Sequence, residues 1–317
     1  MIGKVAVVGS GYMGGGIAQV LALSGREVVL ADASAEQATR SRERIIREAA
    51  DFAERGLFPS EAAERIASGV SAAASIDVAV SDVDLIEEAV PEILELKHDV
   101  LRRISAASRP DAIIGSNTST ISIGTLAAVV ARPERFLGVH FSNPAPFIPG
   151  VEVIPHAGTD PDIAPQVIDV LEQCGKTGVE ITDVTGFVLN RLQYALFSEA
   201  ARLVEEGVAS AEAVDLIART TFGFRLPFFG PFAIADMAGL DVYDFCYRSL
   251  HDAYPDRFTA PDALADRVQQ GRLGVKSGSG FLETPAERLP DLIAYRDEAY
   301  AAMRQLLDRL GTPNIDY

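Results

Sequence analysis

The chain has 317 residues, a length that suits two domains better than one small core. Its formal net charge of −17 gives a surface that repels nucleic acid and anionic lipid, so we expect neither as a partner. No apolar run approaches the roughly 18 residues of a membrane helix. The two cysteines fit neither a disulfide framework nor a metal site, and no pair of histidines has metal-ligand spacing. We therefore expect a cytoplasmic globular protein without a metal.

The first half of the chain alternates short β-branched runs with longer helical patterns. Near-continuous apolar runs, typical of strands covered on both faces, predict strands over residues 4–8, 27–31, 85–88, 112–116 and 136–140, with a further strand near 179–182. Helical patterns lie between them, over residues 14–24, 34–54, 91–107 and 123–130. This alternation predicts an α/β domain of the Rossmann type, with a doubly wound parallel sheet.

The second half reads as helical. Amphipathic patterns cover residues 186–206, 211–219, 231–245 and 291–310, and strand signals are scarce after about residue 185. We therefore predict a Rossmann domain over residues 1–184 and an all-helical C-terminal domain over residues 185–317.

The first predicted strand runs into a glycine-rich segment of the pattern G-x-G-x-x-G, with Tyr12 and Met13 between its second and third glycines. In this pattern Gly9 permits the tight turn, Gly11 lets a pyrophosphate approach the backbone, and Gly14 lets the helix pack close to the strand. The helix start also offers free amides to phosphate. The segment predicts a dinucleotide site, and the alternative is a glycine turn without a cofactor.

Asp32 ends the second predicted strand, 18 residues after Gly14. A carboxylate at this place accepts hydrogen bonds from ribose hydroxyls and repels a 2′-phosphate. The residue therefore favours NAD over NADP.

Polar side chains follow two other predicted strands. His140 ends one strand, while Asn117 and Ser119 come directly after another, so all three should lie at the carboxyl edge of the sheet where ligands bind. Histidine is suited to take a hydroxyl proton at neutral pH, and Glu152, in an apolar segment, could fix its tautomer. The alternatives are a structural histidine, a salt bridge from Glu152 to a basic residue, and simple turn chemistry at Asn117 and Ser119.

With these residues in hand, the chain resembles the L-3-hydroxyacyl-CoA dehydrogenase family, nearly from end to end. The resemblance rests on separated motifs in the family's order: the glycine loop, Glu88-Ala89-Val90-Pro91-Glu92 with Lys97, Asn117-Thr118-Ser119, His140 through Glu152, Gly186-Phe187-Val188-Leu189-Asn190-Arg191, Gly230-Pro231 with Asp236 and Gly239-Leu240-Asp241, and Gly274 through Phe281.

The resemblance implies a mechanism and an assembly. His140 matches the general base that takes the 3-hydroxyl proton, Glu152 its carboxylate partner, and Ser119 and Asn190 the groups that hold the substrate oxygen and orient the histidine. Hydride then passes to NAD and gives a 3-oxo product. The cofactor site is expected to be lined, besides the glycine loop, by Ala89, Val90, Glu92, Lys97 and Asn117. The family also implies a homodimer paired through the helical domain.

The segment after His140 departs from the acyl-CoA pattern, because Ser142 replaces an aromatic residue and Pro149 stands where a lysine is usual. It is similar to relatives that oxidise free hydroxy acids, such as gulonate 3-dehydrogenase and carnitine dehydrogenase. Asn143 is a candidate substrate residue, and Arg225 could hold a free carboxylate or could be a surface arginine. A 3-hydroxyacyl-CoA is the first expectation and a free 3-hydroxy acid the alternative. A second alternative is a non-catalytic structural protein that binds NAD.

Overall fold

The computed structural model describes residues 2–311. The chain separates into two compact units, residues 1–195 and 196–317. The predicted boundary after residue 184 stays a prediction. Helix α8 (Leu189–Glu205) begins in the first unit and ends in the second. None of the described helices is long and apolar enough to cross a membrane.

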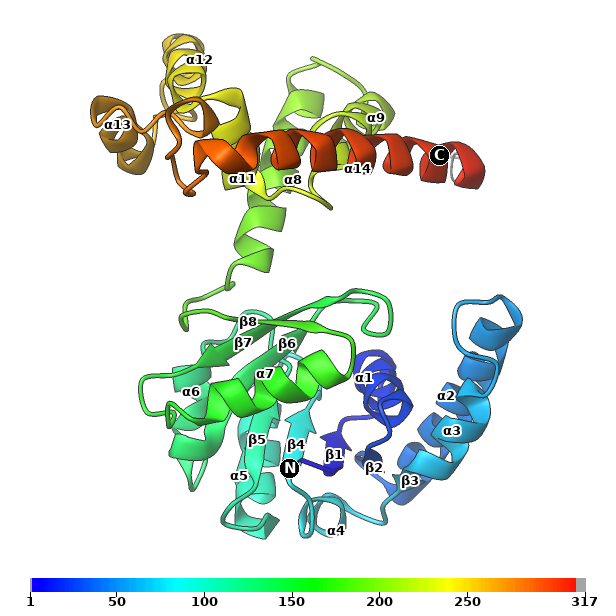
Figure 1. The fold of residues 1–317 in the computed structure, drawn as a ribbon. Helices are drawn as coiled ribbons and strands as arrows, with labels where there is room; N and C mark the ends of the chain where they lie inside the picture. The colour runs from blue at the N-terminus through cyan, green and yellow to red at the C-terminus, as the bar shows by residue number, and fades with distance from the viewer. Residues whose placement is uncertain (1, 312–317) are drawn as a thin grey trace. The chain divides into compact units, whose positions relative to one another are not determined.

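The first unit is built on one eight-stranded sheet with the order β3-β2-β1-β4-β5-β6-β7-β8 (Figure 1). The strands are β1 (Lys4–Val8), β2 (Glu27–Ala31), β3 (Val70–Ala72), β4 (Leu85–Glu88), β5 (Ile113–Ser116), β6 (Phe136–Phe141), β7 (Gly150–Pro155) and β8 (Thr177–Glu180). The sheet winds outward in both directions from β1 and β4, which confirms the predicted doubly wound arrangement. Ligands bind in such sheets at the carboxyl ends of the strands beside this reversal point.

The predicted parallel sheet is confirmed from β1 to β6, and its last two strands depart from it. β7 pairs antiparallel with β6, and β8 pairs parallel with β7, so the last two strands run against the other six. The connection from β6 to β7 covers only residues 142–149, whereas a parallel crossover needs about a dozen residues or more. The chain therefore returns as a hairpin.

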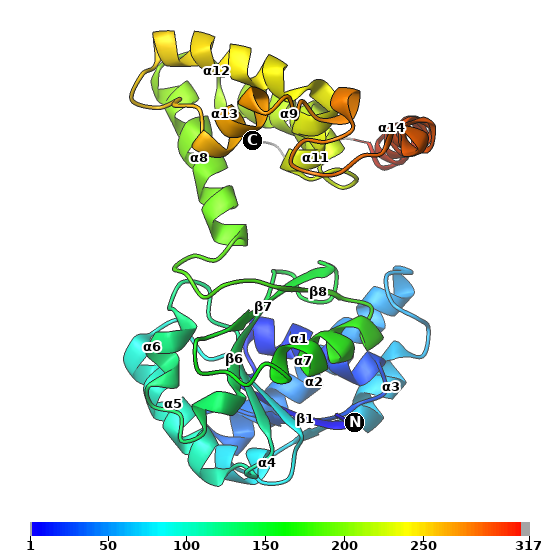
Figure 2. The same cartoon turned by 60° about the vertical axis from the view of Figure 1, so that its left-hand side comes forward.

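Helices cover both faces of the sheet, α1 and α7 on one face and α5 and α6 on the other (Figure 2). Along β1 the side chains alternate between two buried clusters, Val5 and Val7 facing one and Ala6 and Val8 the other. These strands therefore read as continuous apolar runs. The helices of this unit are α1 (Tyr12–Leu23), α2 (Ala35–Glu54), α3 (Ala62–Gly69), α4 (Ile76–Val80), α5 (Leu94–Ala107), α6 (Ile123–Ala127) and α7 (Ile163–Gln173), with the start of α8.

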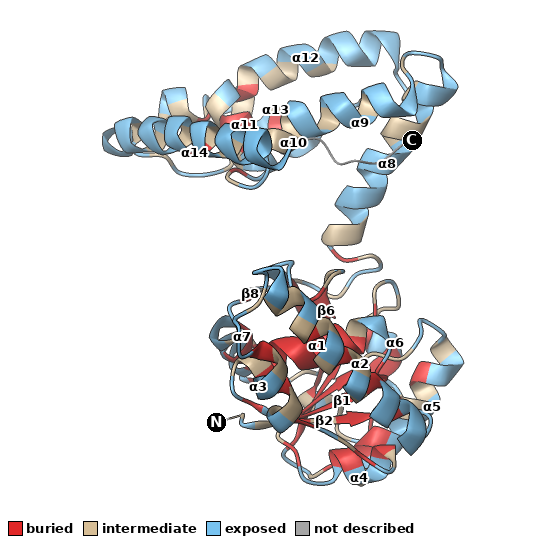
Figure 3. Cartoon of the chain, turned by 90° about the vertical axis from the view of Figure 1, so that its right-hand side faces the viewer, coloured by how far each residue is buried: buried red, intermediate tan, exposed pale blue. Residues whose placement is uncertain are grey.

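The second unit is helical, as predicted, with α9 (Ala211–Thr220), α10 (Phe222–Arg225), α11 (Pro231–Ala238), α12 (Leu240–Ala253), α13 (Asp262–Gln269) and α14 (Leu289–Leu310). The helical pattern predicted over residues 231–245 is confirmed as two helices, because Gly239 has a φ of 101° and separates α11 from α12. Buried residues concentrate in the sheet and in α1, while the helices of the second unit are mostly exposed (Figure 3).

Candidate active site

The hairpin of β6 and β7 brings His140 and Glu152 together. The two residues are direct partners in the antiparallel register, and Nδ1 of His140 lies 2.8 Å from Oε2 of Glu152. Both side chains are largely buried. Because a carboxylate only accepts hydrogen bonds, Nδ1 of the neutral ring carries the proton and Nε2 is left as a hydrogen-bond acceptor. The geometry thus leaves Nε2 able to accept a proton.

The second carboxylate oxygen of Glu152 is held by the start of α8. Its Oε1 accepts hydrogen bonds from the backbone amides of Val188 and Leu189, both at 2.9 Å. Phe187, just before them, has a φ of 51° and is fully buried, and its ring centre lies 5.6 Å from that of His140. Strained backbone of this kind persists where the surroundings enforce it, often at functional sites. Glu152 is thus fixed through both oxygens.

Ser119 and Asn190 meet beside the histidine. The Ser119 hydroxyl lies 3.2 Å from Nε2 of His140, and Nδ2 of Asn190 donates to the backbone carbonyl of Ser119 at 2.8 Å. Asn190 therefore acts on the loop that carries Ser119 and not on the imidazole itself. The structure brings together His140, Glu152, Ser119 and Asn190.

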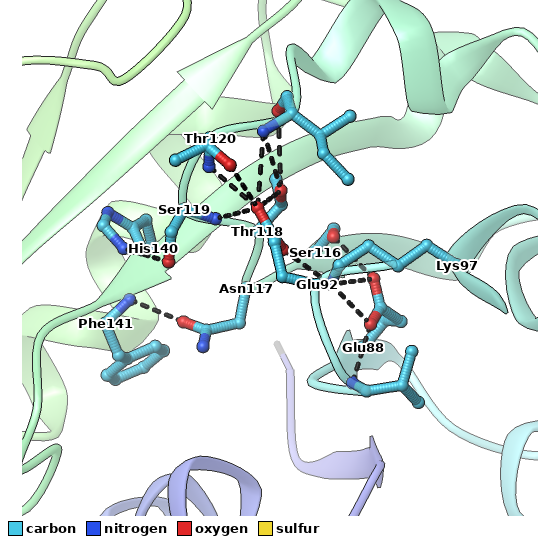
Figure 4. A network of polar contacts seen from close by, with 12 residues as sticks. Glu88, Glu92, Lys97, Ser116, Asn117, Thr118, Ser119, Thr120, His140 and Phe141 are labelled. Atoms are coloured by element: carbon cyan, nitrogen blue, oxygen red, sulfur yellow. Dashed lines mark hydrogen bonds and ion pairs between the residues drawn. The ribbon is translucent and has the colours of Figure 1, made fainter. Parts of the chain in front are cut away.

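The loop after β5 is clamped by Glu92 (Figure 4). One of its oxygens, Oε1, accepts hydrogen bonds from the backbone or hydroxyl groups of four successive residues, Thr118 through Ile121. Burial acts to raise the pKa of the Glu92 carboxyl, but these hydrogen bonds and the charge of Lys97 outweigh burial and lower the pKa to about 2. The carboxylate is therefore charged at neutral pH and fixes the backbone of the Ser119 loop.

Lys97 is fully buried behind Glu92, in an ion pair that the sequence reasoning missed. Its Nζ lies 2.9 Å from Oε1 of Glu88 and 3.5 Å from Oε2 of Glu92. Ser116 donates to Glu88 at 2.6 Å, and so does the amide of Val90 at 2.8 Å. The expectation that Lys97 lines the cofactor site stays a prediction, since its ammonium has no exposed surface. The sequence did contain a sign of this ion pair: Glu88 is a charged residue inside a buried strand and therefore requires a buried partner.

Asn117 joins the ends of two strands. Its Oδ1 accepts the backbone amide of Phe141 at 2.8 Å, which links the loop after β5 to the end of β6 (Figure 4). Ala89 packs on the glycine loop so closely that a Cβ on Gly9 would lie 2.7 Å from the Ala89 carbonyl carbon. Ala89 and Val90, which follow β4, therefore border the loop at the reversal point of the sheet.

The glycine loop has the shape that its pattern predicted. Gly9 has a φ of 95°, and a Cβ on Gly14 would lie 1.9 Å from the Gly9 carbonyl oxygen, so neither position accepts a side chain. A Cβ on Gly11 would meet no atom within 4 Å. The fold thus needs Gly9 and Gly14 but leaves the space over Gly11 free for a ligand.

Tyr12 and Met13 begin α1, whose first turn has no side-chain cap and no acidic residue. Their amides are therefore available to an anion. Asp32 holds the loop from the end of β2: its Oδ2 accepts the amide and the hydroxyl of Ser10, at 2.7 and 2.6 Å, and its Oδ1 accepts the amide of Ala33. Open backbone, free amides and a carboxylate together fit a dinucleotide.

The two substrate candidates lie in different units. Asn143 is exposed in the connection between β6 and β7, and its peptide bond to Pro144 is cis. Arg225 is half-buried in α10 of the second unit. Their assignment to the substrate stays a prediction.

Two family models match the chain. Residues 4–184 match the description "3-hydroxyacyl-CoA dehydrogenase, NAD binding domain", and residues 186–284 match "3-hydroxyacyl-CoA dehydrogenase, C-terminal domain". Helix α14 begins after the second match ends.

Curated relatives and solved structures agree with the family models. A probable 3-hydroxybutyryl-CoA dehydrogenase of Deinococcus radiodurans is 37% identical over 279 residues, 88% of this chain and 99% of the relative. The 5-formyl-3-hydroxy-2-methylpyridine 4-carboxylate 5-dehydrogenase of Mesorhizobium japonicum is 35% identical over 310 residues, 97% of this chain and 99% of the relative.

The crystal structure of a 3-hydroxyacyl-CoA dehydrogenase from Archaeoglobus fulgidus is 33% identical, with a TM-score of 0.79 over 98% of this chain and 99% of that chain. The family fold, the cofactor and the class of reaction follow from these matches. The chain belongs to the 3-hydroxyacyl-CoA dehydrogenase family and is an NAD-dependent oxidoreductase.

Proposed function

We propose that the protein oxidises the 3-hydroxyl of an L-3-hydroxyacyl-CoA of the 3-hydroxybutyryl type to the 3-oxo product. The observation that carries the proposal is the His140–Glu152 pair, which leaves Nε2 free to accept a proton beside the Ser119 hydroxyl. The name of the relative from Deinococcus radiodurans supports the substrate class.

In the proposed mechanism His140 acts as the general base. Nε2 takes the proton of the 3-hydroxyl while C3 gives up a hydride, so the C–OH group becomes a carbonyl. Bound NAD supplies the acceptor for the hydride. Glu152 stabilises the imidazolium that forms, because its Oε2 already accepts the proton on Nδ1. Ser119 shares the substrate oxygen with Nε2, and Asn190 holds the Ser119 backbone in place.

We propose that the glycine loop and Asp32 hold the NAD. The amides of Tyr12 and Met13 would bind the pyrophosphate over the open face of Gly11, and Asp32 would accept the ribose hydroxyls. Replacing Asp32 with alanine should narrow the preference for NAD over NADP, measured as the ratio of kcat/KM values. The same ratio of kcat/KM for NAD to kcat/KM for NADP in the unmodified enzyme and in Asp32→Ala would contradict this role of Asp32.

The central test is the His140→Ala variant. We expect turnover to fall by roughly 10² to 10⁴, the scale of a general base, with the Kd for NAD unchanged. His98→Ala, a half-buried histidine of α5, is the matched control and should keep full activity. Turnover that survives His140→Ala would contradict the mechanism. NAD binding without turnover of any substrate in the unmodified protein would favour the non-catalytic alternative.

A free hydroxy acid is the second candidate substrate. The relative that matches 97% of this chain is named for a pyridine carboxylate, which carries a free carboxyl group. The panel is therefore 3-hydroxybutyryl-CoA, 3-hydroxybutyrate, gulonate and carnitine, followed by the absorbance of reduced cofactor. Turnover of the free acids alone, together with a higher KM for these acids in Arg225→Ala, would favour this candidate over the thioester.

We also propose that the protein is a homodimer paired through its helical unit. That unit exposes large apolar side chains, among them Phe197, Ile217 and Phe245, each more than 60% exposed. Exposed apolar surface of this kind marks association sites. Light scattering after size exclusion should give twice the chain mass, and a monomer mass at micromolar concentration would contradict the proposal.

A further inference from the structure

Arg44 reaches from α2 to the backbone of the glycine loop. Its Nη2 donates to the carbonyl oxygens of Ser10, at 3.1 Å, and of Gly11, at 3.0 Å. Its Nη1 pairs with Glu48 one turn further along α2, at 2.8 Å. The G-x-G-x-x-G pattern does not include this arginine, which lies more than 30 positions after the loop.

Gly15 provides the space that this contact requires. A Cβ at Gly15 would lie 2.6 Å from Nη2 of Arg44 and 2.9 Å from Cγ2 of Ile45. Gly15 is not one of the three glycines of the dinucleotide pattern. The extra glycine therefore has its own physical reason, since any side chain there would push the guanidinium away from the loop.

The two carbonyls that Arg44 holds determine where two amides point. In a planar trans peptide the C=O and the N–H point in opposite directions. With the Ser10 and Gly11 carbonyls turned toward Arg44, the amides of Gly11 and Tyr12 face the other side. Neither amide donates to a protein acceptor within the described residues. These are backbone donors at the open face of Gly11.

The opposite end of the same segment is held by Asp32, which accepts the Ser10 amide and hydroxyl. The Ser10–Tyr12 backbone is thus fixed from two directions, by a carboxylate on the Ser10 amide and by a guanidinium on the Ser10 and Gly11 carbonyls. A loop that is already fixed loses less conformational entropy when a ligand binds.

We propose that Arg44 is a positioning residue for the dinucleotide: it orients the Gly11 and Tyr12 amides toward the bound pyrophosphate and so sets the affinity for NAD. The guanidinium also adds positive charge beside an anionic ligand, partly offset by Glu48. This inference rests on the proposed function of the glycine loop as the NAD site.

The test replaces Arg44 with methionine, which keeps the length of the side chain and removes its donors. The Kd and KM for NAD should rise about tenfold, the effect of losing two ordinary hydrogen bonds. The kcat at saturating NAD should stay within about twofold, because the hydrogen bonds to Arg44 do not involve the reacting atoms. ADP-ribose, which has the pyrophosphate but no nicotinamide, should lose affinity by the same factor.

Arg40→Met is the matched control. Arg40 lies one turn earlier on α2, is exposed and pairs with Glu36, so its loss should leave the Kd for NAD unchanged. Arg44→Lys keeps the charge without the planar group and should give an intermediate Kd, which also serves if Arg44→Met does not fold. An unchanged Kd in a folded Arg44→Met or Arg44→Lys variant would overturn the inference, as would a fall in kcat at an unchanged KM for NAD.

A third variant separates this inference from the site assignment. Gly11→Val adds a side chain where the protein has open space, so the fold should keep its Tm while NAD binding is lost. Retained NAD binding in Gly11→Val would mean that the dinucleotide lies elsewhere, which would contradict the proposed site and with it any role for Arg44. Lost binding in Gly11→Val with an unchanged Kd in Arg44→Met would reject the role of Arg44 alone.

Discussion

Replacing Glu152 with glutamine changes one oxygen of a carboxylate that accepts three hydrogen bonds. Oε2 accepts from the imidazole of His140, and Oε1 from the amides of Val188 and Leu189. Glutamine has a single acceptor oxygen and cannot satisfy both sides. If its oxygen stays on the two amides, its NH2 group faces Nδ1. The imidazole then adopts the tautomer that carries its proton on Nε2. In this tautomer Nε2 cannot accept the substrate proton, as the proposed mechanism requires.

The size of the effect follows from these contacts. A hydrogen bond to a charged group contributes about 1.5–3 kcal/mol, or roughly 10- to 10²-fold in rate if it acts in the transition state. The same exchange behind the histidine of a serine protease lowers kcat by roughly 10⁴, because the tautomer is wrong. We therefore expect Glu152→Gln to lower kcat by roughly 10² to 10⁴.

The assay is the rate of cofactor reduction at saturating NAD and substrate, with the Kd for NAD and the Tm measured on the same samples. Glu180→Gln, an exposed carboxylate on β8, is the control and should behave as the unmodified enzyme. A kcat that falls by less than about threefold in a folded Glu152→Gln protein would show that the carboxylate does not fix the tautomer.

Three further predictions concern ionisable side chains. Burial and the neighbouring Glu88 raise the pKa of Glu87 well above 4.5, so its contribution to stability is present below pH 4.5 and is lost as pH rises toward the folded pKa. Glu87→Gln should thus raise the Tm more at pH 8 than at pH 4, and a pH-independent change would contradict this. The pKa of Glu92 is lowered to about 2, so its contribution is present above pH 4.5 and is lost as pH falls toward 2. Glu92→Gln should make the Tm fall less between pH 4.5 and pH 2. It should also lower kcat by about tenfold, because the charged Glu92 carboxylate holds the Ser119 loop. Full activity in Glu92→Gln would exclude this role in holding the loop. Lys176 donates to the carbonyls of Ala145, Pro146 and Ile148, at 2.6 to 3.1 Å. Lys176→Met should lower the free energy of unfolding by about 1.5–3 kcal/mol, measured by urea unfolding. An unchanged free energy of unfolding would show that solvent replaces the lysine.

The strands and helices with a strong pattern were predicted well. β1, β2 and β4 have the predicted bounds, and in β1 and β2 the apolar run that defines the strand is followed directly by Gly9 and Asp32. Short elements were missed, including β3 and α4, whose burial depends on neighbours far along the chain. β7 was missed although its signal was present: the segment after β6 is too short for a crossover, so a strand there had to run antiparallel.

The candidate site divides in the same way. His140, Ser119 and Asn117 were predictable because parallel strands bring their carboxyl ends to one edge. The partners that hold them were not: Glu92 acts on four residues of a loop more than 25 positions away, and Arg44 acts on carbonyls more than 30 positions away. Every residue type has a backbone carbonyl, and every type but proline has a backbone amide, so the residue types of these loops do not reveal such contacts.

The hairpin of β6 and β7 also bears on how such a protein can change during evolution. His140 and Glu152 are paired through the ladder of β6 and β7, while the connection between these strands, residues 142–149, carries the side chains that differ from the acyl-CoA pattern. If this connection contacts the substrate, as we propose for Asn143, substitutions in it would alter what the enzyme accepts without moving the His140–Glu152 pair, provided its length is kept. An insertion that shifted the register by one residue would instead turn Glu152 to the opposite face of the sheet. Under the proposed function, chemistry and specificity would therefore occupy separate parts of one hairpin, and a designer could vary the second while leaving the first untouched.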